Sequence, residues 1–559
     1  MRGLNVCVAI CLMLCFGCQK NSPAPDTTNG STGGPPPSFS FNALKVNGIS
    51  NGFSYVNVNT TPIVKISFTA ALNRAKVNSA ISFTSASGAA ITYSTSFEDN
   101  DNTIVITPSP GLQYLTKYTL AISTNLTSAI NGNLQSGVAV QLTTAIDSTN
   151  KFTIVTDDQL LDLVQKQTFK YFWDFGHPVS GLARERNTSG EVVTTGGSGF
   201  GIMAIVTAVN RSYVSRADGL ARMQKIVAFL KNTAQKFHGA FPHWINGTTG
   251  VVIPFSDKDN GADLVETSYL MQGLLTARQY FNGAGSDEAT LRNDINSIYN
   301  NVEWDWFRQG GQNVLYWHWS PDYNWAINMK IQGWDEALIV YVLAASSTTH
   351  TIPKVVYDNG WANNGAIKNG GTYYNIQLPL GPSNGGPLFF EHYSFLGINP
   401  KGLVDAYANY ETQTNAHSLI NYNYCVANPK NYYGYSSNCW GLTASDINGG
   451  YTASSPNNDV GVIAPTAAIS SLPYTPAQSL QALRFFYYKL GDKLWGQYGF
   501  YDAFSLNDIW FANSYLAIDQ GPEIVMIENY RTGLLWNLFM SCPEIKTGMK
   551  NIGFSGPNL

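Results

Sequence analysis

The sequence predicts a mainly α-helical protein in which a large helical domain follows a small all-β sandwich. Three observations support this prediction. At 559 residues the chain is too long for one ordinary domain. Hydrophobic residues alternate along short segments before residue 147, whereas after residue 151 they recur at helical spacing. All 13 tryptophans also fall in the second part, which separates a small module from a large aromatic-rich domain.

The first 38 residues have the features of export and tethering. Arg2 precedes an apolar run, Val6–Phe16, which is too short to span a bilayer and ends at Gly17 and Cys18. The pattern resembles a bacterial lipoprotein signal in residues 1–17, which implies acylation of Cys18 and attachment to the outer membrane. Whether the protein lies on the periplasmic or the cell-surface face of that membrane does not follow from the sequence. Simple secretion is the alternative. Residues 18–38 are rich in Asn, Ser, Pro, Thr and Gly and predict a flexible linker.

Residues 39–147 are predicted to form the sandwich. Short segments rich in β-branched residues alternate with Gly, Asn and Asp, which is typical of an immunoglobulin-like fold of about 100 residues. The segments are Ile63–Phe68, Ala90–Thr95, Thr103–Pro108, Tyr118–Ser123 and Ala139–Thr144. Their order resembles bacterial Ig-like modules, which implies a spacer. A glycan-binding module is the alternative.

Residues 151–559 carry apolar residues at spacings of three and four, so this part is predicted to be helical. Long loops, residues 358–396 and 428–465, join some of the helices, and such loops are usually functional. The pattern suggests an (α/α)6 toroid whose loops build a cleft at one end. The predicted helices are Asp157–Phe175, Gly199–Arg211, Arg216–Phe237, Ala262–Phe281, Leu291–Phe307, Asp335–Ser346, Lys401–Glu411, Thr475–Trp495 and Gly521–Met540.

The segment Lys258–Leu275 is the most informative, because Asp259, Asp263 and Glu266 lead into an otherwise apolar helix. Spacings of four and three residues can place all three acids on one helical face. If the helix begins at Ala262, Asp259 lies in the entering loop and the other two lie in the first turns. The alternative is that Asp263 is only an N-terminal acid, favoured there by the backbone N–H groups and the helix dipole.

Aromatic rings are interleaved with acids and histidines in the following residues, at 302–307, 315–320 and 333–341. Flat sugar faces stack on such rings while hydroxyls bind carboxylates, so the pattern is typical of a glycan cleft. Each candidate for substrate contact could also belong to the core. The candidates are Trp317, His318, Trp319, Trp325, His392 and Trp440.

Composition argues against other classes of partner. A net charge of −4 and 13% charged residues provide no field for binding nucleic acid. His238 and His243 have no third metal ligand nearby in the sequence, and the glycine run 196–201 lacks a nucleotide-binding pattern. The sequence therefore predicts no metal and no cofactor. Whether Cys425 and Cys439 form a disulfide stays open, as does the oligomeric state.

Seven motifs between Thr153 and Glu544 resemble the bacterial glycoamylase-like family, and within it glycoside hydrolase family 144. This resemblance implies an (α/α)6 fold and hydrolysis of β-1,2-glucan or its oligosaccharides with inversion of configuration. The motifs are Phe172–Arg186, Thr194–Ala204, Phe237–Gly250, Lys258–Leu275, Gly385–Gly397, Cys439–Asp446 and Ile518–Trp536.

The resemblance assigns functional acids to two segments, which here hold Asp259, Asp263 and Glu266 in one and Glu336 in the other. Glycoside hydrolysis needs a proton donor and a second carboxyl group. We expect Glu336 to be a principal catalytic carboxyl, with the other three supplying its partner. Asp335 stands where the family often has Asn, so its charge should raise the pKa of Glu336.

Several alternatives stay open at this stage. Which carboxyl is acid and which is base, endo or exo action, and the preferred chain length do not follow from the sequence. A surface glycan-binding protein without catalysis and a hydrolase of another glucan are the alternative functions. A lyase on the same fold is a third, although the low Lys and Arg content argues against it.

Overall fold

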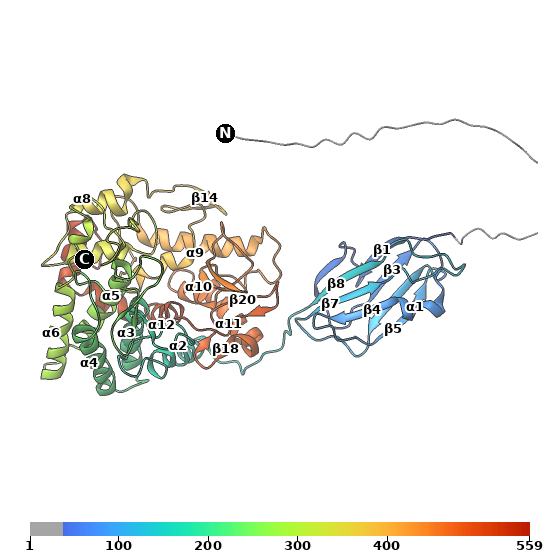
Figure 1. The fold of residues 1–559 in the computed structure, drawn as a ribbon, viewed down its shortest axis with the longest axis horizontal. Coiled ribbons are helices and arrows are strands. Elements are labelled where there is room, and N and C mark those ends of the chain that lie inside the picture. The colour runs from blue at the N-terminus through green and yellow to red at the C-terminus, as the bar shows by residue number, and fades with distance from the viewer. Residues whose placement is uncertain (1–36) are drawn as a thin grey trace, which may run out of the picture. The chain divides into compact units, whose positions relative to one another are not determined.

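The computed structural model describes residues 37–559, which divide into two compact units (Figure 1). The first unit takes in most residues up to Leu142, and the second takes in residues 143–559. The predicted signal peptide, Cys18 and nearly all of the predicted linker lie outside the described residues. Among the described helices, none combines the length and the apolar character needed to cross a bilayer.

The first unit is the predicted sandwich of two sheets. Alternate residues of its strands are buried, as in β3 (Val64–Phe68) and β7 (Lys117–Ile122), because one face of each sheet packs on the core. A short helix, α1 (Arg74–Ala80), precedes β4. One sheet has the order β1 (Phe41–Val46), β3 (Val64–Phe68), β6 (Thr103–Pro108), β5 (Tyr93–Glu98), and the other has the order β2 (Ser54–Val58), β8 (Val138–Thr144), β7 (Lys117–Ile122), β4 (Ile81–Ser85).

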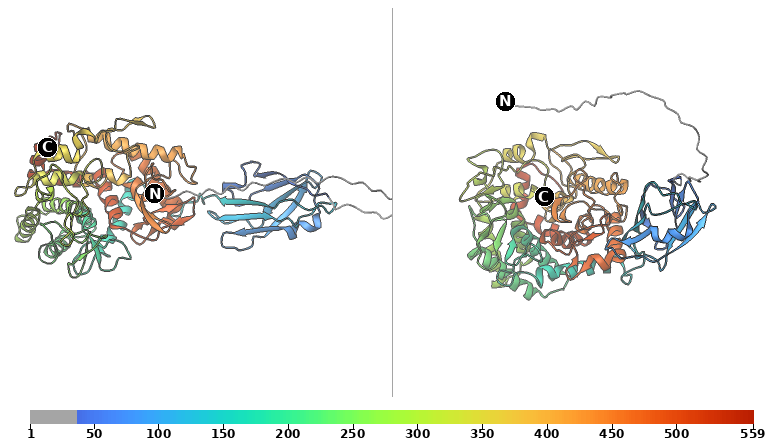
Figure 2. Two further views of the ribbon diagram at one scale, coloured as in Figure 1. Left: turned by 45° about the horizontal axis from the view of Figure 1, so that its top comes forward. Right: turned by 45° about the vertical axis from the view of Figure 1, so that its right-hand side comes forward.

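The second unit is mainly helical, and Figure 2 shows it from two further sides. Its α-helices are α2 (Asp157–Trp173), α3 (Thr195–Asn210), α4 (Arg216–Asn232), α5 (Leu264–Tyr280), α6 (Ser286–Asn300), α7 (Leu338–Ser346), α8 (Lys354–Val356), α9 (Tyr410–Ala427), α10 (Pro465–Ser470), α11 (Pro476–Leu494), α12 (Ala517–Arg531), α13 (Leu534–Met540) and α14 (Pro543–Asn551). Helices α3, α5, α7, α10 and α12 are almost wholly buried, whereas α2, α4, α6 and α11 bury one face. Helices that are buried all round therefore alternate with helices that bury one face. The arrangement of these helices as an (α/α)6 toroid stays a prediction.

Helices α3 and α5 approach each other closely because both contain glycine at the contact. A Cβ at Gly199 would lie 2.1 Å from the Tyr269 carbonyl oxygen, and one at Gly273 would lie 2.2 Å from the Gly199 carbonyl oxygen. No larger residue fits at either position. The glycine run that lacks a nucleotide-binding pattern therefore has a packing role, and α3 begins at Thr195, before the predicted start at Gly199.

Short strands lead into the two central helices. Strand β9 (Val192–Thr194) runs directly into α3, and β12 (Ala262–Asp263) runs into α5. The strands of this unit are β9 (Val192–Thr194), β10 (Trp244–Asn246), β11 (Val252–Ile253), β12 (Ala262–Asp263), β13 (His318–Trp319), β14 (Thr372–Tyr373), β15 (Ile376–Gln377), β16 (Ala444–Ile447), β17 (Gly450–Ala453), β18 (Trp495–Gly496), β19 (Gly499–Phe500), β20 (Phe504–Ser505) and β21 (Trp510–Phe511).

The predicted helix Lys401–Glu411 is wrong. Asp405 instead accepts the backbone N–H groups of Tyr407 and Ala408, which forms a turn that competes with a helix. Helix α9 begins only at Tyr410, after the capping residue Asn409, and was not predicted.

The three cysteines of the described part of the chain, Cys425, Cys439 and Cys542, are buried free thiols. The disulfide between Cys425 and Cys439 that the sequence left open is therefore not formed in this structure.

Candidate active site

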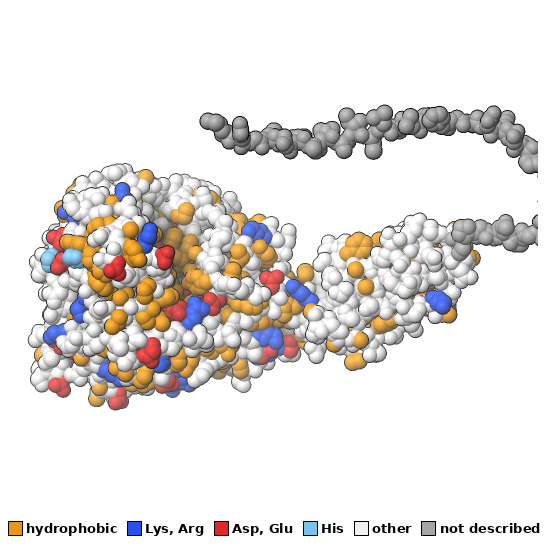
Figure 3. Space-filling model, in the orientation of Figure 1, with side chains coloured by type: hydrophobic (Ala, Val, Ile, Leu, Met, Phe, Trp, Pro, Cys, Tyr) orange, Lys and Arg blue, Asp and Glu red, His pale blue; other side chains and the backbone are white. Residues whose placement is uncertain are grey.

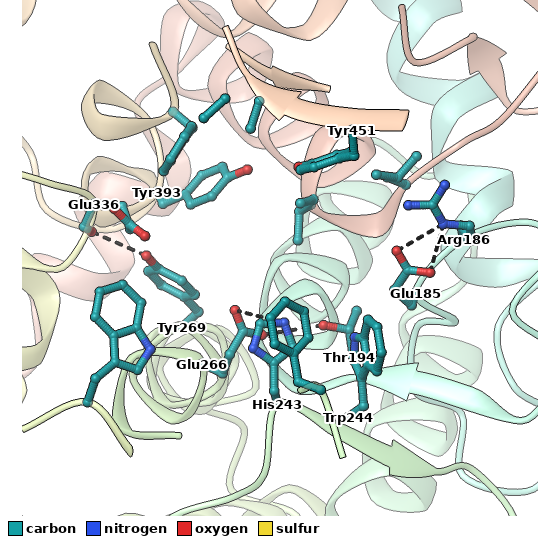
Figure 4. Close-up of a pocket in the computed structure, with 17 residues that line it drawn as sticks. Glu185, Arg186, Thr194, His243, Trp244, Glu266, Tyr269, Glu336, Tyr393 and Tyr451 are labelled. Carbon is teal, nitrogen blue, oxygen red and sulfur yellow. Dashed lines mark hydrogen bonds and ion pairs between the residues drawn. The ribbon is translucent and has the colours of Figure 1, made fainter. Parts of the chain in front are cut away.

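The helical unit contains a cavity of about 430 Å³ whose wall combines carboxyl groups with aromatic rings (Figure 4). Figure 3 shows one face of this unit, where a hollow is bordered largely by hydrophobic side chains. The acids in the cavity wall are Glu185, Glu266 and Glu336, and the rings include Trp244, Phe255, Tyr269, Trp317, Tyr393 and Tyr451.

Glu266 lies in the first turn of α5 and is fixed by the start of α3. Its Oε2 accepts hydrogen bonds from the Gly196 N–H at 2.7 Å and the Thr194 hydroxyl at 3.3 Å. Thr194 is held in turn because β9 pairs with β10. Burial raises the pKa of Glu266, and the neighbouring charge of Asp263 adds to this increase.

Asp263 is the N-cap of α5 and is fully buried. Its Oδ1 accepts the N–H groups of Val265 at 3.0 Å and Glu266 at 2.9 Å, and its Oδ2 lies 3.0 Å from His243 Nδ1. Burial alone would raise its pKa, but the hydrogen bond from His243 and the nearby positive charges lower it. The N-terminal role that the sequence left as an alternative is therefore real, and the same side chain also holds a histidine.

Asp259 and His318 complete this group. Asp259 is 5% exposed, and burial together with the charge of Asp263 raises its pKa to about 7. His318 lies on β13, which pairs with β12, so that its Nε2 is 3.6 Å from Asp259 Oδ2 and 3.7 Å from Asp263 Oδ2.

Among the described residues, Asp259, Asp263 and His318 have donor atoms spaced as a cation would need, all within 4.8 Å of one another. Asp263 already caps α5 and accepts a hydrogen bond from His243. Burial lowers the pKa of His243, but Glu266, Asp263 and Asp259 together raise it to about 9. We therefore assign no metal to this group. The expectation that the protein uses no metal and no cofactor stays a prediction.

Glu336 lies in the segment before α7, is half-buried and lines the cavity. Its carbonyl oxygen accepts from the Tyr269 hydroxyl at 3.4 Å and from the Ser394 hydroxyl, which anchors this segment to α5 and to the η5 turn (Ser394–Leu396). Burial raises the pKa of its carboxyl well above the usual value, and the charge of Asp335 adds to the increase, as the sequence predicted. Asp335 itself accepts the Ala337 N–H at 2.8 Å.

The structure thus brings the four predicted acids together. Glu266 and Glu336 line the cavity. His318 lies between Asp259 and Asp263, and His243 joins Asp263 to the cavity wall. Their catalytic roles stay predictions at this point.

The predicted substrate contacts divide into three groups. Trp317 lines the cavity, and His318 lies with the acids. Trp319 and Trp325 instead pack on Trp306, with ring centroids 5.4 and 4.7 Å apart, and do not line the cavity.

For the remaining two residues the prediction of a substrate contact is wrong. Trp440 is fully buried in the hydrophobic core, so no sugar can stack on it. His392 is buried beside the Ser471 hydroxyl at 3.1 Å, and burial lowers its pKa to about 3.

Sequence reasoning missed His243, Glu185 and Arg186. Arg186 donates to Glu185 at 3.0 Å and to Asp446 at 3.2 Å. These bonds hold its guanidinium group at one end of the cavity (Figure 4). All three missed residues lie inside the family motifs, which was the available signal. His238, considered beside His243, lies elsewhere and pairs with Glu303 at 2.8 Å.

A cavity that combines carboxyl groups with aromatic rings in a mainly helical domain is typical of the helical carbohydrate-active domains. Comparisons with known proteins agree. Residues 328–543 match the family model described as "Putative glucoamylase", and residues 42–153 match a bacterial Ig-like domain.

Solved structures of similar proteins define the family of this chain more narrowly. A putative glucoamylase from Bacteroides uniformis is 56% identical, with a TM-score of 0.72, and the match covers 73% of this chain and all of the other. An endo-β-1,2-glucanase from Chitinophaga pinensis, solved with sophorotriose and glucose, is 51% identical over 73% of this chain and all of the other, with a TM-score of 0.71. The chain therefore belongs to the glycoamylase-like family, as its motifs predicted.

A curated relative is the exo-β-1,2-glucooligosaccharide sophorohydrolase (non-reducing end) from Parabacteroides distasonis, which is 48% identical over 421 residues. The match covers 71% of this chain but only 58% of the relative. The chain thus spans less than two thirds of that protein's length.

Proposed function

We propose that the protein is a glycoside hydrolase that uses paired carboxyl groups. The observation that carries the proposal is the cavity itself, in which Glu336, with its raised pKa, shares the wall with Glu266 and several aromatic rings. A carboxyl group that stays protonated near neutral pH can act as a general acid, while an ionised partner acts as a base.

In the proposed reaction Glu336 gives its proton to the leaving glycosidic oxygen as the bond from that oxygen to the anomeric carbon breaks. A water molecule forms the new bond to the anomeric carbon, and its proton passes to a carboxylate of the group Asp259, Asp263 and Glu266. Inversion follows when the acid and the base stand about 6.5–9.5 Å apart with water between them.

We propose β-1,2-glucan or its oligosaccharides as the substrate. Family membership supports this, because the similar proteins from Chitinophaga pinensis and Parabacteroides distasonis are named for β-1,2-linked substrates. The aromatic rings of the cavity wall suit the flat faces of a neutral sugar chain.

The test is incubation of the protein with linear β-1,2-glucan, β-1,3-glucan and amylose, followed by separation of the products. We expect β-1,2-linked products, little activity on amylose, and a reducing end that is first in the α configuration in proton NMR spectra. Glucose released from amylose at a comparable rate would overturn the substrate, and an initial β-anomer would overturn inversion. Binding without any product would favour a glycan-binding protein.

We further propose export and a lipid anchor on Cys18, with the sandwich as a spacer between membrane and hydrolase. Gly17 and Cys18 after a short apolar run support this proposal. Metabolic labelling with a fatty acid should mark the wild-type chain and not the Cys18→Ser variant. Equal labelling of both would remove Cys18 as the anchor.

A further inference from the structure

His243 lies in the cavity wall and contacts two of the predicted acids. Its backbone carbonyl accepts the Thr195 N–H at 3.0 Å, which fixes it beside the start of α3. Its ring stacks on Phe255, with centroids 4.0 Å apart and planes at 24°, so the ring plane is fixed as well. The side chain is 23% exposed and therefore remains accessible from the cavity.

The orientation of the ring follows from Asp263. Because Asp263 Oδ1 is occupied by two backbone N–H groups, Oδ2 is left for His243 Nδ1 at 3.0 Å. A buried carboxylate only accepts hydrogen bonds, so Nδ1 is the donor. This bond turns Nε2 toward Glu266, as Figure 4 shows.

The gap between His243 and Glu266 has a specific size. Nε2 stands 4.0 Å from Glu266 Oε1, which is too long for a direct hydrogen bond. One oxygen atom can bridge such a gap by accepting from Nε2–H and donating to Oε1, at about 2.8 Å from each. Glu266 cannot simply close the gap, because its other oxygen is held by Gly196 and Thr194.

We propose that His243 Nε2 and Glu266 Oε1 form a binding site for one hydroxyl oxygen, either a sugar hydroxyl or the attacking water. The site pairs an imidazole N–H with a carboxyl oxygen. Burial lowers the pKa of His243, but Glu266, Asp263 and Asp259 raise it and so favour the charged ring. This inference rests on the proposed hydrolase function and adds a residue to it.

Two substitutions of His243 test the roles of Nδ1 and Nε2 separately. In His243→Asn the amide nitrogen can replace Nδ1 and keep the bond to Asp263, but it cannot reach the gap. In His243→Gln the amide can reach the Nε2 position but leaves Asp263 without its partner. His238→Asn is the matched control, because His238 belongs to the same motif but pairs with Glu303 outside the cavity.

We expect His243→Asn to fold and to lose about ten- to hundredfold in kcat/KM on β-1,2-gluco-oligosaccharides, the range for one charge-assisted hydrogen bond. His243→Gln should recover part of this loss, and His238→Asn should match the wild type. A loss in kcat at unchanged KM identifies water as the bound oxygen, whereas a raised KM identifies a sugar hydroxyl. Wild-type kinetics in a folded His243→Asn protein would overturn the inference and leave the hydrolase function standing.

A second measurement does not depend on turnover. In the full chain labelled with ¹⁵N-histidine, addition of sophorotriose should shift the Nε2 resonance of His243 and leave that of His238 in place. If the wild type cleaves no glucan, the proposed function fails, and this titration still reports on the oxygen site. A resonance that does not move at saturating sugar excludes a sugar hydroxyl, and the inference then stands only if kcat falls in His243→Asn.

Discussion

Gly196→Ala tests whether the first turn of α3 holds Glu266 in its working position. A Cβ at residue 196 would lie 2.5 Å from Glu266 Oε2 and 2.8 Å from Tyr269 Cδ2, so the carboxyl group must move. The movement breaks the 2.7 Å bond from the Gly196 N–H. A hydrogen bond to a charged group contributes about 1.5–3 kcal/mol, which corresponds to about a ten- to hundredfold loss in kcat/KM.

The free energy of unfolding should change by less than the activation free energy in this variant. Overpacking costs about 1–3 kcal/mol, but alanine is favoured over glycine in a helix by about 1 kcal/mol, so the two effects partly cancel. Gly285→Ala is the matched control, because a Cβ at this helix N-cap meets no atom within 4 Å.

The assay is kcat/KM on a β-1,2-gluco-oligosaccharide together with Tm for both variants. A folded Gly196→Ala protein with wild-type kcat/KM would refute the reasoning, because it would mean that Glu266 tolerates displacement or is not needed.

Three further predictions concern the proposed catalytic carboxyl Glu336, its neighbour Asp335 and the sandwich. Glu336→Gln should keep the fold and sugar binding but lose at least about a hundredfold in turnover, and normal turnover would remove Glu336 from the mechanism. Asp335→Asn keeps a cap for Ala337 but removes a charge that raises the pKa of Glu336. Because a general acid works only below its pKa, the alkaline limb of the pH–rate profile should move to lower pH, and an unchanged limb contradicts the acid role. Deleting residues 39–145 should leave hydrolysis of short soluble oligosaccharides nearly unchanged. A large loss of activity in a truncated protein that is shown to be folded would mean that the sandwich contributes to the site.

The sequence alone determined the features that depend on neighbours along the chain. Alternation predicted the sandwich strands, and spacings of three and four predicted most helices, because each face of a strand or helix must meet either the core or water. The acids at 259, 263 and 266 were recognisable for the same reason, since carboxyl groups before an apolar helix are unusual.

Tertiary structure decided which distant residues meet. Gly196 reaches Glu266 across 70 positions because α3 and α5 pack through their glycines. His243 reaches Asp263 across 20 positions, and its backbone carbonyl is held by the Thr195 N–H at the start of α3. Trp440 and Trp317 look alike in sequence, yet one is sealed in the core and the other lines the cavity. Periodicity fixes which face of an element is apolar, but it does not say which other element covers that face, and the site depends on that second choice.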